Sequence, residues 1–167
     1  MCARCKTIYS AKILVLAVVL LVSLSLTGVV KAALFNIKLS GSLVTGGDVT
    51  EFDISPDGRY AVFLADARTN TVAELFSVPV AGGERIRLSG TLPTGMWVEG
   101  FLISPNSQSV VYWIANMDGL CSGIYVVPIA GGASVNVGES IPAYKMLTEI
   151  ALTADNDYVV YRLTHHE

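Results

Sequence analysis

The heptapeptide F-D-I-S-P-D-G at residues 52–58 recurs 49 residues later as F-L-I-S-P-N-S at residues 101–107. Two more segments repeat at the same distance. V-P-V-A-G-G at residues 78–83 returns as V-P-I-A-G-G, and the ten residues from Ile37 return from Ile86 with seven identities. A third, partial copy of the first motif begins at Ile150. Because independent matches keep one gapless offset, the chain from residue 37 onward consists of 49-residue repeats.

Each repeat predicts four short strands. In the first repeat, residues 49–54 alternate in character and end at an S-P-D-G turn, whose proline and glycine favour chain reversal. Residues 60–65 are almost continuously apolar, as expected for a strand that is covered on both faces. A third strand is expected at residues 73–78 and, after an A-G-G turn, a fourth at residues 85–89. Four antiparallel strands in each period predict the blades of a β-propeller, with no helix after residue 32.

The repeats are too few to close a propeller. From Ile37 they supply one outer strand at residues 37–40, two complete four-stranded blades and the first two strands of another. Closed propellers contain about four blades or more. The expected fold is therefore an all-β, incomplete propeller over residues 33–167, with about two full blades plus two partial ones. Open terminal faces would expose apolar surface, which predicts marginal stability and either self-association through these faces or a truncated gene product.

The repeat register also predicts which side chains are equivalent. Phe52, Phe101 and Ile150 are expected at matching positions of successive sheets, with their side chains largely buried. A second set of equivalent positions is expected to pack blade against blade; it consists of Phe63, Tyr112 and Tyr161, with Phe76 and Tyr125 beside them.

The motifs I-S-P-D-G-R-Y-x-V-F and E-L-F-S-V-P-x-A-G-G, followed by a short L-S-G strand, resemble the propeller repeats of the TolB-like family. Such six-bladed-type repeats also precede the catalytic domain in serine peptidases of the prolyl oligopeptidase group. The resemblance covers residues 37–167. It implies a structural role, and not a catalytic one, for the turn residues Ser55, Pro56, Asp57, Gly58, Gly82 and Gly83. The second copy departs from the pattern at Asn106 and Ser107, and the third departs at residues 154–156.

Residues 1–32 have the pattern of a secretory leader. Arg4, Lys6 and Lys12 precede an uncharged apolar run at residues 13–30, and V-K-A at residues 30–32 fits a signal peptidase site. We therefore predict an N-terminal hydrophobic signal helix with cleavage after Ala32, and an exported protein that is periplasmic or extracellular. The 18-residue apolar run is also about long enough to span a membrane, so an uncleaved membrane anchor is the alternative.

Charge and cysteine content exclude several functions. The leader holds four of the eleven basic residues and none of the fourteen acidic ones, so the remainder carries seven basic and fourteen acidic side chains, a net charge of −7. This balance argues against nucleic acid as a partner. Cys2 and Cys5 form a lone C-x-x-C inside the leader, so neither a zinc nor a redox site is predicted. Cys121 is then the single thiol of the exported part, and we expect it to be a small buried or loop residue.

The search for chemistry finds no catalytic set. Asp53, Asp57 and Asp66 lack the dense spacing of a calcium loop and are expected to be structural or solvated. The G-x-S-x-G motif of hydrolase nucleophiles is absent from the sequence. His165 and His166 are expected at the frayed end, in a loop between the second and third strands. We therefore predict a protein that is not an enzyme, with no catalytic residues, no cofactor and no metal.

Two aromatic residues are candidates for partner contact. Trp97 and Tyr144 fall in the expected connections between blades, where the other copies carry Asp48, Met146 or Gly95. Exposed Trp and Tyr are enriched at interfaces. The prediction is an exported, non-catalytic propeller module that binds a protein or glycan partner. The alternative is the propeller part of an exported serine peptidase or other hydrolase, without its catalytic domain.

Overall fold

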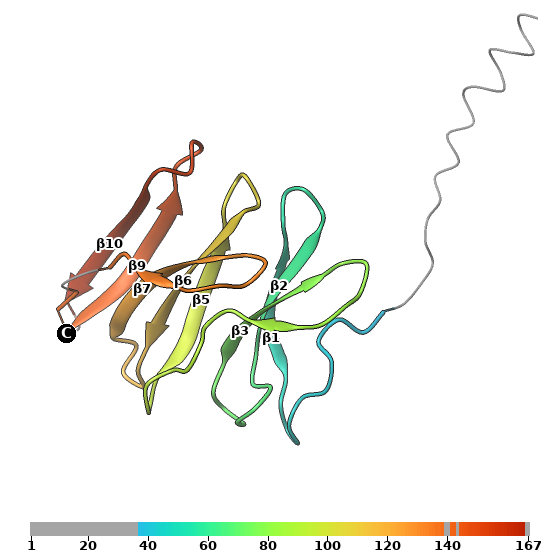
Figure 1. Cartoon of the computed structure of the whole chain (residues 1–167). Coiled ribbons are helices and arrows are strands. Elements are labelled where there is room, and N and C mark those ends of the chain that lie inside the picture. Colours follow the sequence, from blue (N-terminus) through green and yellow to red (C-terminus); the bar gives the residue numbers. More distant parts are fainter. Residues whose placement is uncertain (1–36, 139–140, 143, 166–167) are drawn as a thin grey trace, which may run out of the picture. The chain divides into compact units, whose positions relative to one another are not determined.

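The computed structural model describes residues 37–138, 141–142 and 144–165, and this part of the chain is all-β with no helix. The leader or anchor predicted for residues 1–32 lies outside the described residues. A search of the described residues for a helix that could cross a membrane finds none. The strands form three consecutive antiparallel sheets, shown in Figure 1.

Two four-stranded sheets are followed by a two-stranded one. The first sheet consists, in order, of β1 (Val49–Ile54), β2 (Tyr60–Ala65), β3 (Glu74–Pro79) and β4 (Ile86–Arg87). The second consists of β5 (Trp97–Ile103), β6 (Ser109–Ala115), β7 (Cys121–Pro128) and β8 (Val135–Asn136). The third pairs β9 (Lys145–Leu152) with β10 (Val159–His165). The four-stranded antiparallel repeat unit predicted from the sequence is confirmed.

The strand register repeats at the predicted offset. Phe52 pairs with Phe63 in the first sheet, Phe101 with Tyr112 in the second, and Ile150 with Tyr161 in the third. Rings on neighbouring strands stack in both complete sheets: Phe63 on Phe76 at 5.6 Å between centroids, and Tyr112 on Tyr125 at 5.2 Å. The predicted equivalence of these positions is therefore confirmed.

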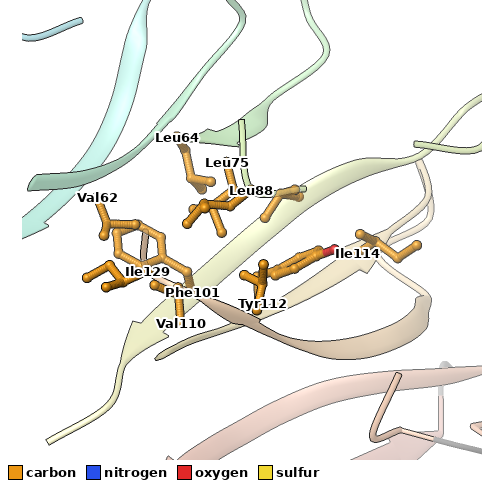
Figure 2. Packing of buried hydrophobic residues seen from close by; sticks show 11 residues of the cluster. Val62, Leu64, Leu75, Leu88, Phe101, Val110, Tyr112, Ile114 and Ile129 are labelled. Atoms are coloured by element: carbon orange, nitrogen blue, oxygen red, sulfur yellow. The ribbon is translucent and has the colours of Figure 1, made fainter. Parts of the chain in front are cut away.

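The main core lies between the first and second sheets, and Figure 2 shows its side chains. Tyr112, the largest of the fully buried side chains, lies in this core, as the repeat register predicted for sheet-to-sheet packing. Leu88 enters the same core just after β4, the fourth strand of the first sheet, and Ile129 enters it just after β7, the third strand of the second sheet. The cluster consists of Val62, Leu64, Leu75, Leu88, Val98, Phe101, Val110, Tyr112, Ile114, Val127 and Ile129.

A second apolar cluster joins the second sheet to the third. Val111, Cys121 and Ile124 are buried there, and partly buried side chains of β9 and β10, including Ile150 and Tyr161, pack against them. Cys121 is thus a small buried residue at the start of β7, as predicted. Consecutive sheets therefore pack face to face. The second sheet meets the first through the face that carries Phe101, and the third sheet meets the second through the face that carries Ile150.

The turns that follow β1, β5 and β9 are linked from sheet to sheet. The amide of Asp57 donates to Ser107 Oγ at 3.0 Å, and the amide of Asn106 donates to Asn156 Oδ1, also at 3.0 Å. Ser107 and Asn156 replace the glycine of the motif and still adopt its positive φ, 62° and 69°. Their side chains bond to the preceding sheet, which a glycine cannot do.

The prediction of an outer strand at residues 37–40 is wrong. No strand forms there, because no strand of the described residues pairs with this segment. Instead Leu39 and Leu43 pack against the outer face of the first sheet. Arg85 holds this segment by donating from Nη1 to the carbonyls of Ser40 and Ser42, and its guanidinium lies 4.7 Å from the centroid of Phe76.

The predicted burial of the Phe52 position is correct for Phe101 but wrong for Phe52. Phe101 is 5% exposed, whereas Phe52 is 71% exposed. The segment with Leu39 and Leu43 covers the central strands of the outer face, including Phe63 and Phe76, but not β1. Phe52 belongs to none of the three apolar clusters of the described residues, and most of its side chain faces solvent. The short β4 also differs from the five residues predicted, because the amides of Leu88 and Ser89 both turn to the carbonyl of Leu75.

Candidate functional site

The strand directions gather three connections at one end of the sheets. In each sheet the first strand runs toward the S-P-D-G-type turn, and the second strand runs back. The β2–β3 loop, the segment that enters β5 and the β6–β7 loop therefore all lie at the end opposite these turns. The three connections come from two adjacent sheets.

These connections line an open apolar pocket of about 410 Å³. Trp97, the first residue of β5, is half-buried and forms one wall. Met96 precedes it, and its Sδ accepts a hydrogen bond from Ser122 Oγ at 3.4 Å. Met117 projects from the β6–β7 loop and is 86% exposed. The pocket is lined by Thr71, Val72, Gly95, Met96, Trp97 and Met117.

Asp66 fixes the β2–β3 loop on one side of this pocket. Its carboxylate accepts the backbone amides of Asp48 and Thr71, the latter at 3.1 Å. These bonds, that from Asp48 first, lower the pKa of the Asp66 carboxyl below its ordinary value. Thr71 has a φ of 69°, so the bond to Asp66 also stabilises an unfavourable backbone conformation. Of the structural or solvated roles expected for Asp66, these hydrogen bonds show the structural one, and they give the pocket a fixed wall.

A polar pocket of about 250 Å³ adjoins the apolar one, and Val72 lines both. Here Arg87 donates to Glu74 Oε1 at 2.7 Å, and the Glu74 side chain is only 8% exposed. The other carboxylate oxygen, Oε2, has no hydrogen-bond partner among the described residues. In the second repeat the two positions hold Gly123 and Asn136, so this ion pair is not required by the repeat.

Tyr144 lies outside the Trp97 pocket. It is 57% exposed, and its ring stacks on His165 at 5.5 Å between centroids. Lys145 Nζ lies 5.6 Å from the centroid of the Tyr144 ring. His165 was predicted in a loop, but it is the last residue of β10 and pairs with Lys145. His166 lies outside the described residues.

Several pocket residues escaped the sequence reasoning. Met96, Met117 and Val72 carry no charge and belong to no motif, so nothing in the local sequence marks them. A usable signal was the departure from the repeat: Met117 stands where the first repeat has Arg68, and Met96 stands where it has Gly47. Apolar residues that are new to one copy, in connections and not in strands, are candidates for contact with a partner.

The fold shifts the pKa values of Cys121 and Asp57, two titratable groups of the described residues. Burial raises the pKa of the Cys121 thiol, which therefore stays protonated near neutral pH. Asp57 accepts the Ser55 hydroxyl at 2.6 Å and the Arg59 amide at 3.0 Å inside its turn. Among the residues that the structure describes, no three His, Cys, Asp or Glu side chains gather in a group that could hold a metal ion.

Comparison of the chain with models of known protein families gives no match. Comparison with curated proteins likewise gives no match.

Proposed function

We propose that this chain is an exported, non-catalytic module of β-propeller blades, similar to the TolB-like repeats, that binds a protein partner through the Trp97 pocket. The 49-residue period, the four-stranded sheets and their face-to-face packing support the propeller part of this proposal. The leader pattern at residues 1–32 supports export.

The pocket itself carries the binding proposal. Its volume of about 410 Å³ falls in the usual range of ligand pockets, about 300–1,000 Å³. It is made by connections from two sheets, so it exists only when both repeats are folded side by side. Loops that a rigid scaffold positions in this way commonly carry binding residues.

The chemistry of the pocket favours an apolar side chain of a protein. Two methionines line the pocket together with Trp97, and thioethers adapt their shape to varied apolar groups. The exposed Met117 loses contact with water when a partner covers it, and burial of apolar surface stabilises the complex. The neighbouring Glu74–Arg87 pair offers polar contacts at the rim. A glycan would use the Trp97 face but would leave both thioethers without apolar contact.

A displayed peptide library, panned on the immobilised full chain, tests this function. We expect enriched peptides with a large apolar anchor residue, and we expect Trp97→Ala or Met117→Asp to weaken their binding by at least about tenfold. Val135→Asp is the matched control, because Val135 is 61% exposed and lies outside the pocket. Enrichment that ignores Trp97→Ala and Met117→Asp, or the lack of any enrichment, would contradict the proposal.

A further inference from the structure

The interface between the first two sheets contains a filled slot. Ile129, just after β7, is 4% exposed and lies among Val62, Phe101 and Val110, as Figure 2 shows. Its amide donates to the carbonyl of Gln108 at 2.9 Å. Its own carbonyl accepts the buried hydroxyl of Ser77 at 2.6 Å.

The same slot is open between the second and third sheets. A cavity of about 330 Å³ lies there, and its walls include Val111, Val126, Asp157 and Val159. Each of these residues stands 49 positions after Val62, Ser77, Gln108 or Val110, four of the residues that surround or bond Ile129. The cavity therefore has the position of the Ile129 slot and much of its lining, although Ile150, the counterpart of Phe101, does not line it, and none of the described residues fills it.

A free strand edge lies next to this slot. In the second sheet β6 pairs with both β5 and β7, but β10 pairs only with β9 among the described strands. One row of β10 backbone amides and carbonyls is thus available for a further strand. In the second sheet the strand in this position, β7, leads directly into Ile129.

We propose that this edge and slot together bind an extended apolar peptide segment, which adds to β10 as a strand and inserts an aliphatic side chain into the slot. The surface is distinct from the Trp97 pocket and adds a second binding function. Main-chain hydrogen bonds to a sheet edge supply affinity, and a side-chain pocket supplies specificity.

The occupied slot shows which peptide fits. In the first interface the segment is the strand β7, which ends at Pro128 and continues as I-A-G-G at residues 129–132. An aliphatic residue after the proline would donate its amide to the carbonyl of Asp157, as Ile129 does to Gln108. Val126 stands where Ser77 donates its hydroxyl, so recognition in the open slot depends more on aliphatic burial than on that bond.

Fluorescence anisotropy with the full chain tests this proposal. The probe is a labelled synthetic peptide with the sequence of residues 123–132, G-I-Y-V-V-P-I-A-G-G. We expect saturable binding, and we expect a peptide with aspartate in place of its isoleucine after proline to bind at least about tenfold more weakly. Amides of β10 should also gain protection from hydrogen exchange when the peptide binds.

Two variants of the protein locate the site. Val159→Phe puts a larger apolar group into the slot and should reduce peptide binding at least about tenfold, whereas Val160→Phe, on the opposite face of β10, should change it less than about twofold. Equal binding of the two peptides, or equal effects of the two variants, would overturn the proposal. Absence of peptide binding together with a dimer that Val159→Phe dissociates would assign the slot to a second copy of the chain and would also overturn it. Trp97→Ala should leave this binding unchanged, so the two proposed surfaces fail or succeed separately.

Discussion

The two sheet-to-sheet interfaces use equivalent residues and reach different degrees of burial. Between the first and second sheets, Leu88 and Ile129 are 3% and 4% exposed. Between the second and third, the Leu88 counterpart Val137 is 39% exposed, and the counterpart of the Ile129 slot is a cavity of about 330 Å³. The faces that meet are alike, so the difference comes from the third and fourth strands, which the second sheet has and the two described strands of the third sheet do not supply.

This comparison shows how a repeat of this kind acquires its core. The first two strands of each sheet provide the face that packs on the preceding sheet, as Phe101 and Ile150 do. The segment after the third strand then closes the gap between the sheets, as Ile129 does. A repeat therefore completes the interface with its predecessor only when its second half is present.

The largest expected effect comes from truncating equivalent aromatic residues in the two interfaces. Tyr112→Ala removes a side chain that is 2% exposed and should lower the free energy of unfolding by about 3–5 kcal/mol. Tyr161→Ala removes its half-buried counterpart and should cost about 1–2 kcal/mol. Urea unfolding of both variants measures the difference. Equal losses would show that the second interface is as well packed as the first.

The slot itself gives the next largest effect. Ile129→Ala leaves a cavity in the first interface, and we expect a loss of about 2–5 kcal/mol in the free energy of unfolding. Val80, its counterpart after β3, is 37% exposed, so Val80→Ala should cost less than about 1 kcal/mol. Thermal or urea unfolding measures both. A Val80→Ala loss as large as that of Ile129→Ala would mean that Val80 is buried against another part of the molecule in solution.

Much of this architecture was predictable from the sequence because the repeats keep one register. The turn motif, the continuous apolar runs and the 49-residue offset predicted the four strands and the equivalence of Phe63, Tyr112 and Tyr161. Burial was harder to predict, because it depends on the neighbouring sheet and not on the repeat. Phe52 and Phe101 occupy the same register position, yet among the sheets that the structure describes only Phe101 packs against a neighbouring one.

The candidate site was less accessible from the sequence. Trp97 was singled out because the other repeats lack it, and the structure does place it in a pocket wall. Its neighbours Val72 and Met117 come from loops that approach it only after the two sheets pack, and loop positions carry no periodicity. Tyr144 was singled out on the same grounds, but it stacks on His165 outside this pocket.

A smaller effect is expected at the turn that joins the two complete sheets. Ser107→Ala removes the acceptor of the Asp57 amide and keeps the unfavourable positive φ, so it should cost about 0.5–1.5 kcal/mol. Ser107→Gly loses the same bond but relieves the backbone strain, so its stability should stay within about 0.5 kcal/mol of the wild type. Urea unfolding separates the two. If both variants lost the same free energy, the bond to Asp57 and not the backbone conformation would dominate at this position.

The smallest effect is expected from the charge of Asp57 in the turn after β1, because the uncharged Asn106 accepts the same two kinds of hydrogen bond in the turn after β5. Asn106 Oδ1 accepts the Ser104 hydroxyl at 2.7 Å and the Gln108 amide at 3.0 Å, as Asp57 does with Ser55 and Arg59. The Ser55 hydroxyl first, and then the Arg59 amide, lower the pKa of Asp57 below its ordinary value of 3.8.

A carboxyl whose pKa is lowered by folding stabilises the fold above its unfolded pKa and loses that contribution as the pH falls through the folded pKa. Asp57→Asn should therefore match the wild type near neutral pH and lose less stability on acidification from about pH 5 to about pH 3. Asp155, whose pKa is also lowered, is present in both proteins, so its own contribution cancels in the difference. Urea midpoints of the two proteins, measured across this range, give the comparison. Parallel pH profiles would show that the charge of Asp57 adds no stability beyond that of the uncharged hydrogen bonds that Asn106 makes.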